Sequence, residues 1–222
     1  MEILEIKDLE ILAKKRVPKM FFDYVNSGSW TETTYNENVS DFQKIKLRQR
    51  VAIDMSNRTL ETKMINQPVS MPVAIAPTGL TGMQRADGEI LAAQAAEEFG
   101  IPYTLSTMSV CSIETVAEKT TKPFWFQLYV MKDKKFMERL IDRAKEAKCN
   151  ALVLTLDLQL LGQRHKDLRN GLSTPPKLIP KHIYQVLTRP MWCLRMLTTK
   201  NHFFGNIVGH VKGIKDVRSL GS

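Results

Sequence analysis

Four short apolar runs alternate with helix-like segments between residues 69 and 157. The last run, residues 151–157, holds five apolar residues and one Thr and then stops at a carboxylate, Asp157. A run this short and apolar is typical of a strand buried on both faces, as in a parallel sheet covered by helices. Alternation of such runs with helices predicts βαβ units and an α/β fold. The other expected strands are residues 69–76, 103–106 and 124–129.

The segments between these runs have the caps and spacing of helices. Residues 86–99 are rich in alanine and end at Gly100, a residue suited to the left-handed position after a helix. Ser112 is a good N-cap for a brief helix, and Asp133 is one for a strongly amphipathic helix. A preface of residues 1–65 is expected to hold helices over 6–16, 18–26 and 31–45.

Polar side chains stand where each expected strand ends. In parallel α/β folds the chemistry gathers at the carboxyl ends of the strands, where the βα loops begin. We therefore expect these side chains to line one site. A simpler role competes with this one, because Asp157, Ser106 and Thr155 can each cap a following helix. The strand-end residues are Thr78, Ser106, Gln127, Tyr129, Thr155 and Asp157.

The charge balance points to an anionic partner. The chain has 32 Lys and Arg against 23 Asp and Glu, a net charge of +9. This excess is typical of proteins that meet nucleic acid, a phosphate-bearing cofactor or lipid headgroups. The three widely spaced cysteines predict neither a disulfide framework nor a metal site, which favours a reducing compartment. The N-terminus lacks the pattern of a secretory signal, and no run of apolar residues is long enough to span a bilayer.

Residues 168–222 break the alternating pattern. From residue 168 to 215 there is no Asp or Glu, while eight Lys or Arg are mixed with aromatic and aliphatic residues. Pro175, Pro176, Pro180 and Pro190 interrupt the segment, so we expect a long loop-like insertion. Such a composition favours contact with an anionic membrane surface. Packing on its own protein or on a neighbouring subunit is the alternative, and nucleic acid is a weaker one because no aromatic platform is evident.

Six dispersed blocks resemble the FMN-dependent α-hydroxy-acid oxidase and dehydrogenase family, in order and spacing over residues 5–180. The blocks are FDY with SG at 22–28, IAPT at 75–78, LS at 105–106, FQLY at 126–129, TLD at 155–157 and LGQR at 161–164 with Asp167. The amino-acid sequences of these blocks are most similar to those of the family's respiratory, quinone-linked bacterial L-lactate dehydrogenases. The resemblance implies an eight-stranded (β/α)8 TIM barrel with a helical preface. Residues 66–167 would supply its first four βα units, that is, the N-terminal half of the barrel.

The resemblance also implies a set of contacts with FMN and none with a metal. Pro77, Thr78 and Gly79 would place main-chain groups beside the flavin ring, and glycine permits a close backbone approach. The polar edge of the flavin would be hydrogen-bonded by Ser106, Gln127 and Thr155. Such contacts tune the electronics of a cofactor that carries the redox chemistry itself.

Substrate contacts follow from the same resemblance. Tyr24 would bind the substrate carboxylate, Tyr129 its hydroxyl group or developing carbonyl, and Arg164 would help to neutralise the carboxylate. Asp157 would orient and stabilise a protonated catalytic His. Taken singly, the tyrosines are also compatible with an ordinary core and Arg164 with a surface charge. His165 receives no role, and Met108 stands where many relatives carry an aromatic residue that faces the substrate.

The family's catalytic base is a His followed three residues later by Arg, and this pattern does not occur in the sequence. His165, His182, His202 and His210 all lack it. We therefore expect residues 1–222 to be the N-terminal portion of a longer enzyme, truncated after Ser222 and inactive alone. The whole enzyme would oxidise an L-2-hydroxy acid, L-lactate to pyruvate, and pass electrons to quinone in the respiratory chain. The alternative is a non-catalytic half-barrel that acts as a binding or assembly module.

The expected location is peripheral, on the cytoplasmic face of the bacterial inner membrane. The expected partners are a small 2-hydroxy acid, quinone, an anionic membrane surface and further copies of the full-length chain, with no nucleic acid.

Overall fold

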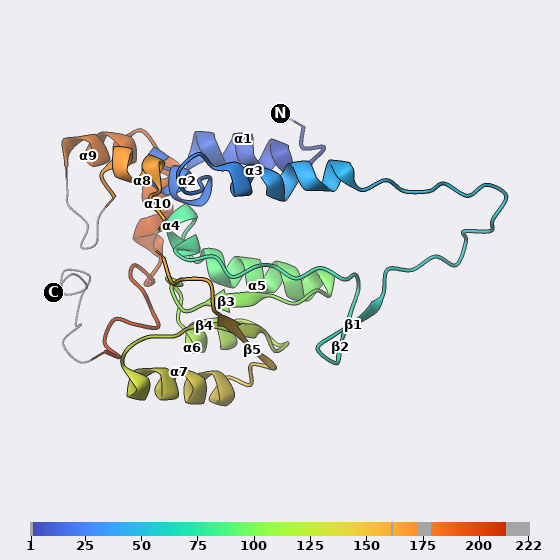
Figure 1. Ribbon diagram of the computed structural model, residues 1–222. Coiled ribbons are helices and arrows are strands. Elements are labelled where there is room, and N and C mark those ends of the chain that lie inside the picture. Colours follow the sequence, from blue (N-terminus) through green and yellow to red (C-terminus); the bar gives the residue numbers. More distant parts are fainter. Residues whose placement is uncertain (1, 161, 173–178, 212–222) are drawn as a thin grey trace.

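The computed structural model describes residues 2–160, 162–172 and 179–211. Its centre is a parallel three-stranded sheet of β3 (Thr104–Ser106), β4 (Trp125–Tyr129) and β5 (Ala151–Thr155), with β4 in the middle. In the register, Ser106 lies opposite Gln127 and Tyr129 opposite Thr155. Helices pack on this sheet around one shared core, and the preface helices form a separate layer above them in the view of Figure 1. The alternation of helices with parallel strands confirms the α/β prediction.

The helices around the sheet begin and end where the sequence predicts. They are α5 (Gly88–Phe99), α6 (Ile113–Ala117) and α7 (Lys134–Glu146). The Ser112 side chain accepts a hydrogen bond from the Thr115 amide, and Asp133 accepts one from the Phe136 amide. Gly100 ends α5 with a φ of +83°, a left-handed conformation that glycine adopts without strain. The core between helices and sheet includes Leu105, Phe126, Ile113, Phe136 and Leu140, all nearly or fully buried.

The preface holds its helices between Ile6 and Lys44 and is extended after them. Its elements are α1 (Ile6–Arg16), α2 (Lys19–Val25), α3 (Thr33–Ser40) and the 3-10 turn η1 (Asp41–Lys44). Residues 45–61 then form a long extended arm without helix or strand, which reaches away from the other layers (Figure 1). The arm returns to an antiparallel hairpin of β1 (Thr62–Met64) and β2 (Gln67–Val69).

The prediction of a strand over residues 69–76 was wrong. Val69 closes β2, and the only sheet contact of the following stretch in the described structure is an isolated parallel bridge between Ile75 and Tyr103. Pro72 and Pro77 account for the difference, because proline donates no hydrogen bond to a sheet ladder. The Ile75 bridge nevertheless leads the chain beside β3 and into α4 (Thr81–Gln84).

The prediction that residues 151–157 are buried on both faces also needs correction. In β5 the side chains of Leu152 and Leu154 are 47% and 48% exposed, and Leu156 beyond the strand is 67% exposed. β5 is an edge strand of the described sheet, and the described residues leave one of its faces uncovered. The apolar residues at 151–156 therefore form a surface that is suited to burial, but no described residue covers it.

The basic segment, residues 168–222, forms helices rather than one long loop up to Thr198, whereas its described residues 199–211 have neither helix nor strand. It contains the second half of α8 (His165–Asn170), followed by α9 (Pro180–Leu187) and α10 (Pro190–Thr198). Pro180 and Pro190 do not interrupt these helices but occupy their first positions, where the missing N–H costs nothing. Residues 173–178 and 212–222, which include Pro175 and Pro176, lie outside the described residues.

Several buried contacts join this segment to the rest of the molecule. Gln185 accepts a hydrogen bond from the Met20 amide at 2.9 Å, and Trp192 donates to the Met83 carbonyl at 2.9 Å. Further along, the fully buried Asn206 accepts from the Ile113 amide at 2.9 Å and donates to Ser109 Oγ at 2.9 Å. The segment thus packs on the preface and on the sheet domain. Among the described residues, no helix is long and apolar enough to cross a membrane.

Candidate active site

Three polar side chains form a hydrogen-bonded row across the carboxyl edge of the sheet. Ser106 Oγ donates to Gln127 Oε1 at 3.2 Å, and Gln127 Nε2 donates to Thr155 Oγ1 at 2.7 Å. Ser106 and Gln127 are buried, whereas Thr155 is half-buried on the edge strand. Each strand contributes one member because β3, β4 and β5 run parallel and end at the same edge. The polar row of Ser106, Gln127 and Thr155 was predicted from the sequence, and the structure brings its members together.

The turn after Ile75 lies beside this edge. Pro77 and Thr78 are exposed, and the Leu80 amide donates to the Met108 carbonyl at 3.0 Å. A Cβ at Gly79 would stand 3.3 Å from both Met108 Cβ and the Tyr24 hydroxyl, a tight contact, so glycine lets these groups approach the backbone without shifting. Within the described part of the chain, the Thr78 and Gly79 amides have no hydrogen-bond acceptor. The turn therefore presents two free N–H donors.

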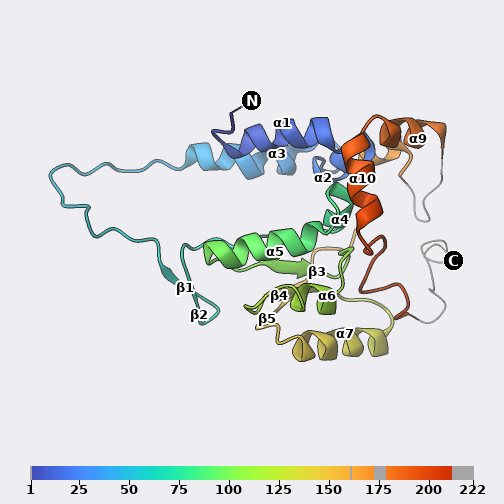
Figure 2. The ribbon, with the colours of Figure 1, turned by 180° about the vertical axis from the view of Figure 1, so that it is seen from behind.

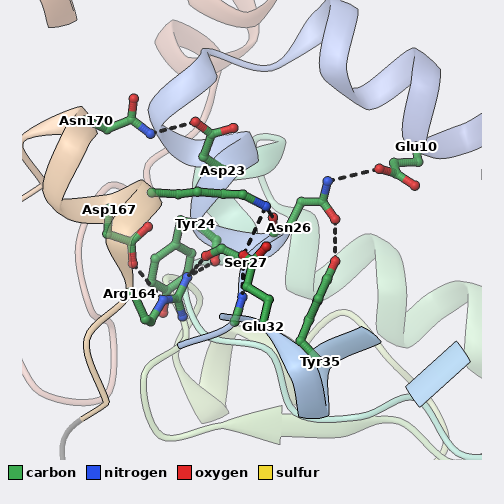
Figure 3. A network of polar contacts seen from close by, with 12 residues as sticks. Glu10, Asp23, Tyr24, Asn26, Ser27, Glu32, Tyr35, Arg164, Asp167 and Asn170 are labelled. Atoms are coloured by element: carbon green, nitrogen blue, oxygen red, sulfur yellow. Dashed lines mark hydrogen bonds and ion pairs between the residues drawn. The ribbon is translucent and has the colours of Figure 1, made fainter. Parts of the chain in front are cut away.

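The preface contributes Tyr24, which lies against Arg164 (Figure 3). The Arg164 guanidinium stands 4.6 Å from the centroid of the Tyr24 ring, a cation–π contact. The same guanidinium donates to the Tyr24 carbonyl and to Ser27 Oγ, and it pairs with Asp167 at 2.7 Å. These contacts fix the position of Arg164, which joins α2 to the start of α8 across about 140 residues of sequence.

The two predicted substrate tyrosines share an electrostatic environment. Burial raises the pKa of Tyr24, although the adjacent Arg164 lowers it, and Tyr129 and Asp167 raise it further. Burial and the nearby Asp157 carboxylate both raise the pKa of Tyr129. Both phenols are therefore protonated near neutral pH and are able to donate a hydrogen bond to an anion. Asp157 itself is exposed, beyond the end of β5.

Sequence reasoning missed the residues that support Arg164. Asp167 was part of a matched block but received no role, and burial raises the pKa of its carboxyl against the opposing effect of Arg164. Ser27 and Asn170 were also overlooked; Asn170 donates to Asp23 Oδ2 at 2.7 Å, next to this cluster. The i, i+3 spacing of Arg164 and Asp167 in a helical start was the available signal.

No histidine completes the site in the described structure. His182 is buried and its Nε2 lies 2.7 Å from the Asn170 carbonyl, while His165 begins α8. His202 packs its ring edge against Phe203, and the His210 carbonyl accepts from Arg139. None of the four is hydrogen-bonded to Asp157 among the described residues, which agrees with the missing His pattern in the sequence.

The sequence was compared with protein families and with curated relatives. The model of the FMN-dependent dehydrogenase family matches residues 13–220. An L-lactate dehydrogenase of Acinetobacter baylyi is 43% identical over 227 residues, covering 100% of this chain and 59% of the relative. One of Vibrio parahaemolyticus is 43% identical over 201 residues, covering 90% of this chain and 53% of the relative. The chain thus spans a little over half the length of these relatives.

Solved structures agree with the sequence matches. The crystal structure of the monotopic membrane protein (S)-mandelate dehydrogenase superposes with a TM-score of 0.90 at 30% identity, covering 100% of this chain and 58% of that one. A soluble mutant of the membrane-associated (S)-mandelate dehydrogenase from Pseudomonas putida gives a TM-score of 0.75 at 32% identity, with 92% and 58% coverage. The chain belongs to the FMN-dependent dehydrogenase family.

Proposed function

We propose that this chain supplies the N-terminal part of an enzyme that oxidises an L-2-hydroxy acid, most specifically L-lactate to pyruvate, with FMN as cofactor. The observation that carries the proposal is the convergence of Tyr24, Arg164 and Gly79 beside the polar row. The Tyr24 hydroxyl lies close to Gly79, in the turn that presents two N–H donors, and the Tyr24 ring lies against the guanidinium of Arg164. A cation, two protonated phenols and a set of polar groups suited to a flavin are thereby brought to one edge of the sheet.

The residues present fit FMN in their chemistry. An isoalloxazine ring has hydrogen-bond acceptors and one N–H donor along its polar edge. The polar row offers hydroxyl and amide groups of both kinds, and the turn offers the free N–H groups of Thr78 and Gly79 next to Pro77. The missing side chain at Gly79 leaves room for a flat ring to approach the backbone. FMN, when bound, would accept the two electrons of the oxidation.

The protein groups would bind and orient the substrate. Tyr24 and Arg164 would hold the carboxylate, and Tyr129 would donate its hydroxyl hydrogen to the oxygen that becomes the carbonyl. The raised pKa of Tyr129 keeps this hydrogen in place at neutral pH. Asp157 would stabilise the imidazolium of a base that these 222 residues do not provide. For that reason we expect the chain alone not to turn over L-lactate.

The same proposal assigns a role to each part of the chain. Residues 1–65 are the preface that supplies Tyr24, residues 66–167 hold the cofactor edge, and residues 168–222 form a membrane-contact insertion. The exposed apolar side chains of α9 and α10, among them Tyr184, Leu187 and Leu197 at 71%, 71% and 81%, support membrane contact. A peripheral position on the cytoplasmic face of the inner membrane would place the enzyme near quinone. The full-length protein would be a homo-oligomer.

A non-catalytic half-barrel is the second candidate. The uncovered face of β5 and the missing base favour it, because such a chain could serve in binding or assembly. A direct assay separates the two. Purified residues 1–222 would be mixed with excess FMN, L-lactate and an electron-accepting dye, beside a chimera in which they precede the unmatched C-terminal part of the A. baylyi relative. The proposal predicts dye reduction by the chimera and none by the chain alone. A flavin-loaded chimera that L-lactate does not reduce would favour the binding module.

A further inference from the structure

A groove of about 610 Å³ lies between α1 of the preface, the end of α4 and the start of α10. Figure 2 shows these three elements meeting at one corner of the molecule, away from β5. The volume falls within the range of about 300 to 1,000 Å³ that is typical of ligand sites. The candidate active site shares none of the residues that line this groove, so the proposed oxidation does not account for it.

One wall of the groove is apolar and firmly held. It includes Leu9 and Leu12 from α1 and Met191 and Trp192 from α10. The Trp192 ring stacks on Phe21 with a centroid distance of 5.6 Å, and its Nε1 donates to the Met83 carbonyl at 2.9 Å. With its polar atom satisfied, Trp192 presents a fixed apolar surface. An occupant with hydrocarbon groups would bury this wall.

The remaining lining is cationic. Five lining residues carry a positive charge and none carries a negative one: Lys15, Arg16, Arg85, Arg189 and Arg195. In the described part of the chain, none of the five forms an ion pair with a carboxylate. Arg189 donates to the Val17 and Thr188 carbonyls, which hold it at the groove without neutralising it. So many uncompensated cations around one hollow favour an anionic occupant.

We propose that this groove binds a single anionic phospholipid, with its phosphate among the arginines and an acyl chain along Leu9, Leu12 and Trp192. Basic pockets beside apolar surfaces recognise lipid headgroups by this combination of charge and hydrocarbon contact. A soluble phosphate would leave the apolar wall exposed, and a nucleic acid would leave it without a hydrocarbon partner. The inference rests on the proposed membrane association. It adds that one lipid is held in a defined site by residues of the preface as well as the basic segment.

The test uses dihexanoyl phosphatidylglycerol below its critical micelle concentration, so that binding does not require a bilayer. Isothermal titration calorimetry would compare the wild-type chain with the groove variant Arg85→Gln/Arg195→Gln. The matched control is Lys181→Gln/Lys200→Gln, which removes two exposed cations of the same basic segment outside the groove. Circular dichroism would show that each variant is folded. The proposal predicts a Kd that rises about fivefold for each charge removed from the groove. The control stays within about twofold of wild type, and the phosphatidylcholine analogue binds weakly.

Several outcomes would overturn the site. Equal weakening in the groove and control variants would show that only overall charge matters. Inorganic phosphate binding as tightly as the lipid would show that the apolar wall contributes nothing. A dimer that dissociates in the groove variant would identify a second copy as the occupant. Sedimentation of the protein with phosphatidylglycerol vesicles is measured in parallel. If the protein sediments with vesicles but does not bind the dissolved short-chain lipid, the groove proposal alone is refuted. If it binds the dissolved lipid but does not sediment with vesicles, the membrane proposal is refuted.

Discussion

Gln127 in β4 donates a hydrogen bond from its side-chain Nε2 to Thr155 Oγ1 in β5 at 2.7 Å. The same Gln127 side chain accepts from Ser106 Oγ at 3.2 Å, so one residue of the central strand ties both neighbouring strands together. A buried amide of this kind is costly to leave unsatisfied, which makes the row rigid once it forms. The edge that we assign to the flavin is thus held in place before any ligand arrives.

Replacing Gln127 with Leu should damage both the sheet edge and FMN binding. The substitution leaves the buried Ser106 hydroxyl without its Gln127 Oε1 acceptor, whereas the Thr107 amide, which reaches Oε1 at 3.3 Å, keeps its bond to the Gln127 carbonyl at 3.1 Å. The expected loss in the free energy of unfolding is about 1 to 3 kcal/mol, measured by urea denaturation. FMN affinity of the chimera should fall as well, measured by flavin fluorescence. Gln94→Leu is the control, because Gln94 is exposed and its side chain bonds the Lys119 carbonyl alone among the described residues. Equal losses in both variants would contradict a special role for the row.

Tyr129→Phe should lower turnover without unfolding the protein. The hydroxyl is expected to donate to the reacting oxygen, and its raised pKa keeps it protonated. Loss of such a donor in a positioned site lowers kcat by about 100- to 1,000-fold. Steady-state kinetics of the chimera with L-lactate would measure this, with Tyr184→Phe, an exposed tyrosine of α9, as the matched control. An unchanged kcat would remove Tyr129 from the proposed site.

Asn206→Ala should destabilise the packing of the basic segment on the sheet domain. Asn206 is fully buried, accepts from the Ile113 amide and from Arg143, and donates to Ser109 Oγ. Its loss leaves buried partners unpaired, at an expected cost of about 2 to 3 kcal/mol. Thermal and urea unfolding would measure the change. Asn150→Ala removes a hydrogen bond to Gln67 on the surface and should lower the free energy of unfolding far less. Equal losses in the two variants would show that the buried hydrogen bonds of Asn206 do not stabilise this packing.

The ion pair of Glu114 and Arg143 predicts a pH dependence. Arg143 contacts both carboxylate oxygens at 2.6 and 2.8 Å and lowers the pKa of Glu114 from an ordinary 4.5 to about 2. A depressed folded-state pKa contributes stability above about pH 4.5, and this contribution is lost as the pH falls toward 2.

The expected size of this effect is modest, because Glu114 is 48% exposed and solvent screens the pair. Glu114→Gln should cost about 1 kcal/mol at pH 7 and close to nothing near pH 2. Urea unfolding at several pH values would show the convergence. Glu118→Gln is the control, since Glu118 has no ion pair among the described residues. A difference that is constant across this pH range would contradict the assignment.

The elements with local signals were predictable from the sequence. The caps at Ser112 and Asp133 and the terminal Gly100 fixed the helix ends, and the strand-end polar residues pointed to the row. Contacts between distant segments were not predictable in this way. The pairing of Arg164 with Tyr24 and Ser27 depends on how α8 packs on α2, which no local pattern encodes. Pro180 and Pro190 were misread because proline both breaks a helix and begins one, and the flanking residues decide between these roles.

The measurement that tests the account most directly is anaerobic reduction of the flavin in the chimera. L-lactate and D-lactate would be added separately while the flavin absorbance is followed. The account predicts bleaching by the L-isomer, a much slower reaction in the Tyr129→Phe chimera, and none with the D-isomer. It would be contradicted by a flavin-loaded chimera that no L-2-hydroxy acid reduces. Failure to retain FMN, while the full-length A. baylyi relative retains it under the same conditions, would contradict the assignment of the cofactor edge to these residues.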